Sequence, residues 1–148
     1  MFDWAKNKFN QGRDTFLTEV SRYKGKDFMQ GCVAAGTYMA FADGVVTPQE
    51  KQKLIKYFEI SDALKVFSTE EVIREFQKLS EKFDFDLDIG RSECLKIIGK
   101  LRNKPDEARA AVRLGVMIAK SDANFDEAEK QALVEICNEL GLKPDEFF

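Results

Sequence analysis

The fold is decided by a stretch that the chain contains twice: VAAGTYMAFADGVVTPQEKQKL, residues 33–54, and VRLGVMIAKSDANFDEAEKQAL, residues 112–133. A shift of 79 residues aligns the two copies without a gap, and eight of the 22 aligned positions are identical. The identical pairs are Val33/Val112, Gly36/Gly115, Ala40/Ala119, Asp43/Asp122, Glu50/Glu129, Lys51/Lys130, Gln52/Gln131 and Leu54/Leu133. Two widely spaced copies are too few for a solenoid, so the repeat predicts two related helical hairpins in one bundle.

Each copy is predicted to form a helix, an acidic turn and a second helix. In the first copy, Thr47 and Glu50 have the spacing of a capping box, and Pro48 takes the first helical position, so a helix begins here. In the second copy, Glu129 holds the same third position after Asp126. A carboxylate there reaches back to a backbone N–H and faces the positive end of the helix dipole. Capping alone is therefore one complete explanation of both glutamates.

The aspartates of the two turns are harder to explain by local structure. Asp43 and Asp122 each lie where an apolar helix is expected to end, and a carboxylate there faces the negative end of the dipole, at a cost of roughly a few tenths of a kcal/mol. An aspartate can instead bond to backbone N–H groups of the following turn, which is an alternative without any ligand. If the two hairpins pack antiparallel about a pseudo-two-fold axis, these aspartates converge with Glu50 and Glu129, and a cation would offset their mutual repulsion.

The metal-site hypothesis therefore names four ligands: Asp43, Glu50, Asp122 and Glu129. The chain has no histidine, so every histidine-based metal or catalytic site within it is excluded. Oxygen donors alone favour a hard divalent cation of the Ca²⁺ or Mg²⁺ type. Neither residues 122–133 nor residues 84–95 form an EF-hand loop, because both lack the sixth-position glycine and the twelfth-position glutamate.

Helical periodicity extends over the rest of the chain, and no period-2 strand pattern appears. The sequence predicts an all-α, single-domain bundle of about seven to eight helices over residues 1–148, with related halves at about 27–60 and 106–141. The expected helices cover about residues 2–22, 27–43, 47–60, 68–83, 88–101, 103–121 and 126–141. Gly36 and Gly115 lie inside helices, where glycine costs about 1 kcal/mol, so we expect close helix–helix contacts at both.

Two local features accompany these helices. Ser68 and Glu71 have the spacing of a second capping box, which is expected to open the helix at residue 68. The stretch DFDLDIG, residues 84–90, is expected to be a linker. Its alternating acids would face water, while Phe85 and Leu87 anchor it to the core.

The composition is that of a soluble globular protein, with 44% apolar and 33% charged residues. The N-terminus carries charges where a secretory signal would be apolar, and the longest uncharged run, 15 residues from Phe28 to Ala42, is short for a membrane span. The three cysteines, Cys32, Cys94 and Cys137, are widely spaced and form no CxxC motif. A zinc site or disulfide framework is therefore not expected, and the cytoplasm is the expected compartment.

The net charge of −3 is unevenly distributed along the chain. Residues 1–30 carry six basic and four acidic residues, whereas residues 121–148 carry eight acidic and two basic residues. An acidic chain without a basic stripe predicts no nucleic-acid partner. No nucleophile with a matched base and no glycine-rich phosphate loop is present, so we do not expect an enzyme.

Residues 1–25 are predicted to contain an amphipathic helix. Its aromatic residues recur every seven positions: Phe2, Phe9, Phe16 and Tyr23. With the basic residues around it, such a stripe could lie on a membrane surface or on a partner. More often a stripe of this kind belongs to the core, and we favour that interpretation.

Several segments, taken together and in order, resemble the tellurite-resistance protein TerB family over nearly the whole chain. The matching segments are RYKGKDFMQG (22–31), ADGVVTPQEKQK (42–53), LKVFSTEEVIREFQKL (64–79), FDFDLDIG (83–90), AKSDANFDEAEK (119–130) and LGLKPDEF (140–147). The resemblance implies an all-α fold with two similar halves and a cytoplasmic, non-enzymatic protein of the tellurium-resistance stress system.

The resemblance also implies binding of a divalent metal through acids, which match Asp43, Glu50, Asp122 and Glu129 here. It implies two kinds of partner, a TerC-like membrane protein and TerD-like calcium-binding proteins, which would bring the chain to the inner face of the cell membrane. One departure argues against a symmetric site, because Ala123 and Asn124 stand where the family tends to have glycine and another small polar or acidic residue. The alternative is a purely structural protein–protein interaction module with no metal site.

Overall fold

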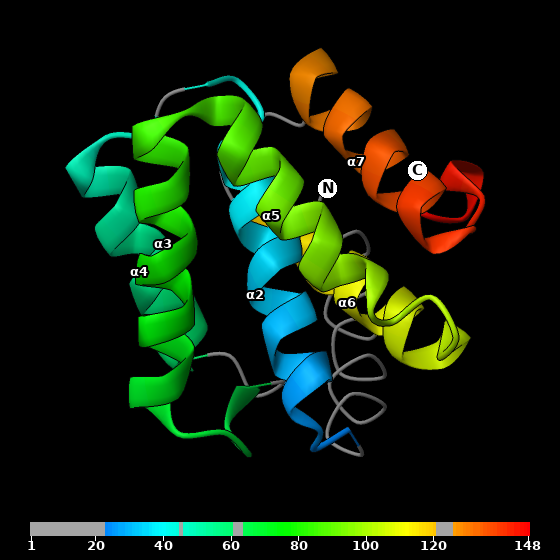
Figure 1. The fold of residues 1–148 in the computed structure, drawn as a ribbon, viewed down its shortest axis with the longest axis horizontal. Coiled ribbons are helices and arrows are strands. Elements are labelled where there is room, and N and C mark those ends of the chain that lie inside the picture. Colours follow the sequence, from blue (N-terminus) through cyan, green and yellow to red (C-terminus); the bar gives the residue numbers. More distant parts are fainter. Residues whose placement is uncertain (1–22, 45, 61–63, 121–125) are drawn as a thin grey trace, which may run out of the picture.

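The computed structural model describes residues 23–44, 46–60, 64–120 and 126–148 (Figure 1). Within these ranges the chain is all-helical, as predicted, with six α-helices and one short 3₁₀ helix. The elements are α2 (Lys26–Ala40), α3 (Pro48–Ile60), α4 (Thr69–Phe85), α5 (Leu87–Gly99), α6 (Pro105–Lys120), α7 (Glu127–Leu140) and η2 (Pro144–Glu146). The amphipathic helix expected within residues 1–25 lies almost entirely outside the described residues. Among the described residues, no helix combines the length and the apolarity that crossing a bilayer requires.

Helix α2 is the centre of the bundle. It is buried from Gly31 to Met39 without interruption, because it packs against α4, α5, α6 and α7 on its several sides. Its most extensive contact is with α6, the first helix of the second repeat. A Cβ atom added to Gly115 would lie 3.3 Å from the Ala35 Cβ, and one added to Gly36 would lie 2.8 Å from Ile118 Cδ1. The expected close helix–helix contact at both repeat glycines is thus confirmed.

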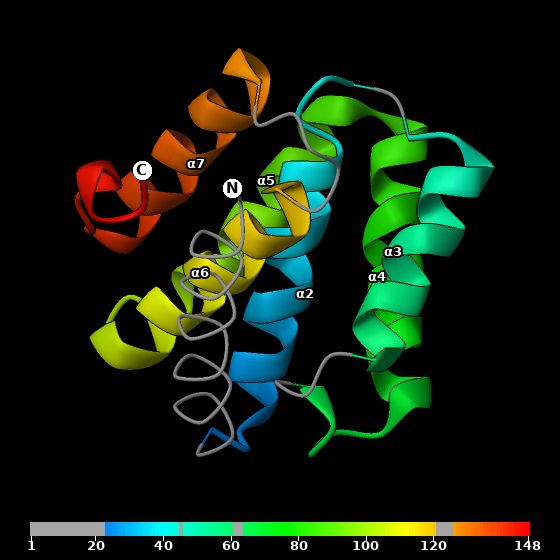
Figure 2. The same cartoon turned by 180° about the vertical axis from the view of Figure 1, so that it is seen from behind.

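From the sequence, we expect the acids of the two turns to converge if the two repeat hairpins pack antiparallel. The structure has a different arrangement. Figures 1 and 2 show α2 and α6 crossing while running in the same general direction, so that both end at the same end of the molecule. Met39 and Ala40 of α2 share a pocket there with Ile118 and Ala119 of α6. The two acidic turns therefore start from neighbouring points, without antiparallel packing.

The first acidic turn begins earlier than the sequence predicted. Helix α2 ends at Ala40 with Phe41 as C-cap, whereas the prediction extended it to Asp43. The chain then turns through a Gly44 N–H to Phe41 carbonyl bond of 3.0 Å, and Gly44 has a φ of +102°, which favours glycine. The ring of Phe41 stacks on Phe83 with centroids 4.4 Å apart, and this contact holds the turn against α4. Asp43 consequently lies in the turn, beyond the strongest part of the helix dipole.

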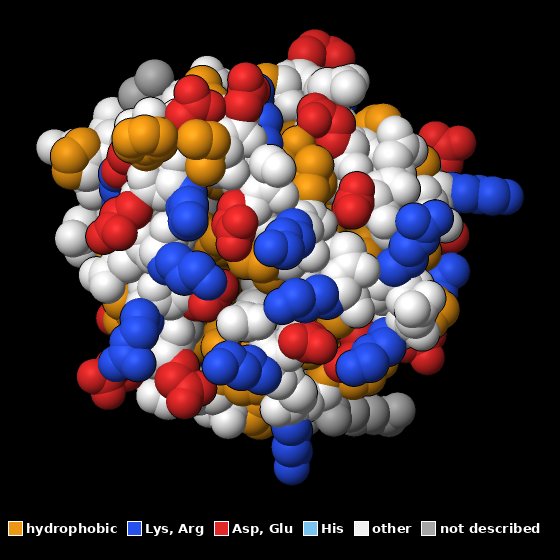
Figure 3. Space-filling model, in the orientation of Figure 1, with side chains coloured by type: hydrophobic (Ala, Val, Ile, Leu, Met, Phe, Trp, Pro, Cys, Tyr) orange, Lys and Arg blue, Asp and Glu red, His pale blue; other side chains and the backbone are white. Residues whose placement is uncertain are grey.

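The expected linker at residues 84–90 is wrong, because Asp86 is at once the C-cap of α4 and the N-cap of α5. Its carboxylate accepts hydrogen bonds from Asp88 N and Ile89 N, at 2.8 and 3.1 Å, so a single residue joins the two helices. The expected anchoring of Phe85 is also wrong, since its side chain is 82% exposed, whereas Leu87 does pack against the core. Figure 3 shows hydrophobic side chains gathered over this corner, on a face where acidic and basic groups are interspersed.

The predicted helix starts have mixed outcomes. The capping box of Thr47 and Glu50 is confirmed by bonds in both directions, and the box that joins Asp126 to Glu129 is complete. Ser68 occupies the N-cap of α4 as expected, yet its side chain makes no capping hydrogen bond, so the predicted capping box does not form there. Helix α7 ends at Gly141 in the left-handed conformation, with a φ of +72°, as its sequence predicts.

The three cysteines are free thiols that lie inside the bundle. Burial raises the pKa of Cys32 and of Cys94 well above the ordinary value. Burial, with a smaller effect of Glu146, raises the pKa of Cys137 to about 11. Thiols of this kind are protonated at neutral pH, which makes them poor nucleophiles and poor metal ligands.

Candidate functional site

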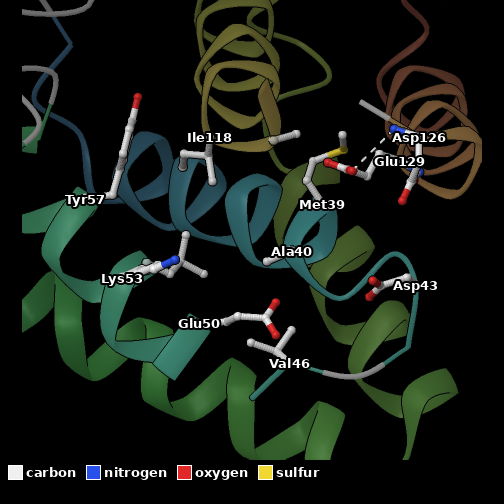
Figure 4. A pocket seen from close by; sticks show the side chains of 12 residues that line it. Met39, Ala40, Asp43, Val46, Glu50, Lys53, Tyr57, Ile118, Asp126 and Glu129 are labelled. Atoms are coloured by element: carbon white, nitrogen blue, oxygen red, sulfur yellow. Dashed lines mark hydrogen bonds between the residues drawn. The ribbon is translucent and has the colours of Figure 1, made fainter. Parts of the chain in front are cut away.

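A pocket of about 430 Å³ opens where the two repeat hairpins meet (Figure 4). It lies beside the C-terminal ends of α2 and α6 and the N-terminal ends of α3 and α7. The residues that line it are Met39, Ala40, Asp43, Val46, Glu50, Lys53, Leu54, Tyr57, Ile118, Ala119, Asp126 and Glu129. Three of the four predicted ligands therefore line one pocket, and the fourth, Asp122, lies outside the described residues.

On the α3 side, Glu50 is held by its capping box. Its Oε1 atom accepts from the Thr47 hydroxyl at 3.0 Å and from the Thr47 backbone N–H at 3.4 Å, while the Glu50 N–H donates to Thr47 Oγ1 at 3.2 Å. These bonds occupy one carboxylate oxygen and fix the direction of the side chain. Figure 4 shows the Glu50 carboxylate extending into the pocket beside Val46.

On the α7 side, two carboxylates are held in the same way. Asp126 Oδ1 accepts from the Glu129 N–H at 2.8 Å, and Glu129 Oε1 accepts from the Asp126 N–H at 3.4 Å. Both helix N-termini are positive ends of helix dipoles, which stabilise carboxylates placed beside them. The pocket thus receives anionic groups from two helix ends that face a common space.

Asp43 remains without a local structural role in the described residues. It is exposed in the turn after α2, and no backbone N–H or side chain of the described residues donates a hydrogen bond to its carboxylate. The alternative explanation, a bond from Asp43 to backbone N–H groups of its own turn, finds no such donor among the described residues; residue 45 of this turn lies outside them. Figure 4 places its carboxylate at the edge of the pocket, facing Glu50 and Glu129.

Sequence reasoning missed two charged residues of this pocket. The sequence pattern around Asp126 predicts only a helix cap, although the shift of 79 residues makes it the counterpart of Thr47, and the structure places it beside the predicted ligands. Lys53 belongs to no motif of the sequence, yet it lies three residues after Glu50 and hence on the same face of α3. Helical spacing together with the repeat would have found both.

The chemistry of these donors suits a hard cation, because all of them are carboxylates. Their spacing is loose: among the described residues, no three Asp, Glu, Cys or His side chains lie close enough together to hold an ion by themselves. Apolar side chains, which include Met39, Leu54 and Ile118, form other parts of the pocket wall. The arrangement is an open acidic basin rather than a closed coordination cage.

Comparison with known proteins identifies the family of the chain. Residues 29–148 match the family described as "Tellurite resistance protein TerB". The chain belongs to the TerB family. A curated TerB relative, "Tellurium resistance protein TerB" from Alcaligenes sp, is 45% identical over 115 residues, which cover 78% of this chain and 94% of the relative. No solved structure matches the chain.

The TerB match covers both repeat copies, the pocket and the α4–α5 corner. Membership of the TerB family supports a role related to tellurite resistance, and this family is not a known enzyme family.

Proposed function

We propose that this TerB-family chain is a non-enzymatic binding protein of the tellurite-resistance system, which takes up a divalent cation of the Ca²⁺ or Mg²⁺ type in the acidic pocket. The observation that carries the proposal is that Asp43, Glu50, Asp126 and Glu129 line one pocket although they come from two separate hairpins. Asp122, the counterpart of Asp43, is proposed as a further ligand on the basis of the repeat. Carboxylates gathered in this way repel one another, and a divalent ion would offset that repulsion.

The exposure of these groups bears on the strength of binding. Asp43, Glu50 and Asp126 are exposed, and the capping bonds of Glu50 leave its Oε2 atom for a ligand. A cation in such a basin would keep several water molecules, as Mg²⁺ commonly does and Ca²⁺ tolerates. We therefore expect weak, reversible binding, with a Kd on the order of 10⁻⁴ to 10⁻³ M.

A second candidate is an interaction module without any metal, and one observation favours it. The capping boxes account for Glu50, Asp126 and Glu129 through bonds that need no ligand. Under this alternative, only Asp43 would lack a structural reason. Both candidates share the proposed partners, a TerC-like membrane protein and TerD-like calcium-binding proteins, at the inner face of the cell membrane.

The two candidates are separated by titration of Ca²⁺ and Mg²⁺ into the full chain while backbone amide shifts are recorded. The proposal expects saturable shifts around residues 43–50 and 126–129, with strong attenuation in Asp43→Asn. The matched control is Asp88→Asn, because the Asp88 side chain is 93% exposed and lies outside the pocket. Absence of saturable shifts, or equal shifts in Asp43→Asn and the wild type, would favour the module without metal.

A further inference from the structure

The α4–α5 corner, residues 83–89, exposes apolar side chains instead of burying them. Phe85, the last residue of α4, is 82% exposed, and Ile89, in the first turn of α5, is 43% exposed. Figure 3 shows hydrophobic side chains gathered over this corner. Phe83 and Leu87, two positions before and after Phe85, pack against the core, whereas Phe85 does not. Large aromatic side chains of this kind often anchor protein interfaces.

A hollow of about 380 Å³ lies beside Phe85. Its apolar lining includes Phe41, Phe83 and Leu87. Its charged lining consists of the carboxylates of Asp84 and Asp86, and no lysine or arginine of the described residues contributes to it. Val46 is the one residue that lines both this hollow and the acidic pocket, so the two are separate surfaces of the described structure.

The carboxylates of the corner differ in how closely a base pairs with them. Asp84 Oδ2 lies 2.6 Å from Lys51 Nζ, so the charge of Asp84 is paired. Asp86 Oδ1 accepts the two N–H bonds that cap α5, and no base of the described residues forms an ion pair with this carboxylate. The Asp88 side chain is 93% exposed, and its Oδ1 atom is 3.8 Å from Arg91, which is too far for a hydrogen bond. The corner therefore presents two incompletely paired carboxylates beside exposed apolar side chains.

We propose that the α4–α5 corner docks a basic, apolar segment of a partner protein, with an apolar side chain packed on Phe85 and a lysine or arginine paired with Asp86 and Asp88. This surface does not depend on the proposed cation site. Charge complementarity selects the occupant, because the same carboxylates would repel the anionic headgroups of a membrane. In a two-fold dimer through this corner, the carboxylates of both copies would face one another. Lys82, an exposed base three residues before Phe85, disfavours a basic partner and limits its affinity.

The first test measures binding of a fluorescent amphipathic peptide of leucine and lysine, about 14 residues long, to the full-length protein by anisotropy. EDTA is present, so that the result is independent of the cation site. Phe85→Ser is expected to weaken binding about tenfold, because the ring supplies the apolar contact. Ile60→Ser is the matched control and should bind like the wild type, because Ile60 is 61% exposed and lies on α3, outside the corner. Equal affinities of Phe85→Ser and the wild type, or no saturable binding by the wild type, would overturn the inference.

The second test examines the charges of the corner. Asparagine also caps a helix, so Asp86→Asn removes a charge and keeps the cap of α5. It should weaken binding of the lysine peptide about threefold at low ionic strength, and added salt should shrink the difference. Lys82→Gln should strengthen binding. A peptide with glutamate in place of lysine should bind about tenfold more weakly, and equal binding of the two peptides would overturn the inference.

Two further measurements address other occupants of the corner. Self-association of the wild type in sedimentation velocity, if Phe85→Ser abolishes it, would assign the corner to a second copy of this chain. Co-sedimentation with vesicles of phosphatidylcholine and phosphatidylglycerol, if Phe85→Ser abolishes it, would assign the corner to a membrane. Either result would overturn the inference, which expects the wild type and Phe85→Ser to behave alike in both measurements.

Discussion

Tyr38 of α2 donates a 2.7 Å hydrogen bond to Glu135 of α7, across 97 residues of sequence. The bond lies against the core, since Tyr38 is only 3% exposed, and it fixes the helix that carries Asp126 and Glu129 onto the central helix. Tyr38→Phe should therefore lower the free energy of unfolding by about 1–2 kcal/mol, because the Glu135 carboxylate loses its donor. Urea unfolding measures the change. Glu135→Gln keeps an acceptor oxygen and should therefore lose less free energy of unfolding than Tyr38→Phe. If the free energy of unfolding of Tyr38→Phe equals that of the wild type, the bond contributes nothing to stability.

Alkaline pH should destabilise the protein because it deprotonates two buried groups, the thiol of Cys137 and the hydroxyl of Tyr38. Burial raises the pKa of Cys137 from 9.0 to about 11, and burial together with the bond to Glu135 raises the pKa of Tyr38 above 10. A pKa that is higher in the folded state means that the folded chain favours the protonated form. The stabilisation is thus complete below pH 9 and is lost as pH rises toward 11, by about 2 kcal/mol from Cys137 alone.

Denaturant unfolding between pH 8 and 11 checks this expectation. Cys137→Ala should show a shallower decline over the same range, because the titrating thiol is gone. A wild-type free energy of unfolding that stays constant from pH 8 to 11 would contradict it.

The contact between α4 and α5 should tolerate no side chain at Gly90. A Cβ atom there would lie 2.8 Å from the Phe83 Cα and 2.4 Å from its ring, and the backbone atom cannot rotate away. Gly90→Ala should cost about 1–3 kcal/mol of stability, measured by urea unfolding. Gly25→Ala is the matched control, since nothing lies within 4 Å of the added atom. Equal stability of the two variants would show that the helices can separate at little cost.

Phe85 should be replaceable, although Phe83 and Leu87, two positions before and after it, pack into the core. Because its side chain is 82% exposed, Phe85→Ser should change the free energy of unfolding by less than about 0.5 kcal/mol. Its neighbour Phe83 is 3% exposed, and Phe83→Ala should cost about 3–5 kcal/mol. Thermal unfolding of both variants measures these two changes in stability. A large loss of stability in Phe85→Ser would contradict the prediction.

Asp126 offers a way to separate capping from cation binding. Asparagine caps a helix as well as aspartate does, so Asp126→Asn should leave the metal-free stability within about 0.5 kcal/mol of the wild type. The same change removes a charge from the pocket and should weaken the stabilisation that Ca²⁺ gives, seen as a smaller rise in Tm on adding Ca²⁺. If Ca²⁺ raises the Tm of Asp126→Asn and of the wild type equally, Asp126 is a cap and not a ligand.

Local signals made most of the fold predictable. Thr47 with Glu50, Asp126 with Glu129, and Gly141 each have a defined position in a helix terminus, so the sequence placed these boundaries correctly. The repeat glycines were also found, because a mid-helix glycine without a packing reason is costly.

The errors arose where tertiary contacts decide the outcome. The stacking of Phe41 on Phe83 and the positive φ of Gly44 shape the turn that ends α2 early, and neither leaves a pattern in the sequence. The alternating acids of residues 84–88 predict a solvated linker, whereas in the structure one of them, Asp86, caps α5. The position of Lys53 beside the acidic pocket depends on how α2, α3 and α6 pack together, and no local sequence pattern specifies that packing.

The junction at Asp86 limits how the length of this protein can change. Since one residue both ends α4 and begins α5, the corner contains no spare chain that could absorb an added residue. An insertion there would rotate every later residue of α5 by about 100°, given 3.6 residues per turn, and would turn Gly90 away from Phe83. We expect variation in length among related chains to avoid this corner, whereas the fold would tolerate substitution of the exposed Phe85 beside it.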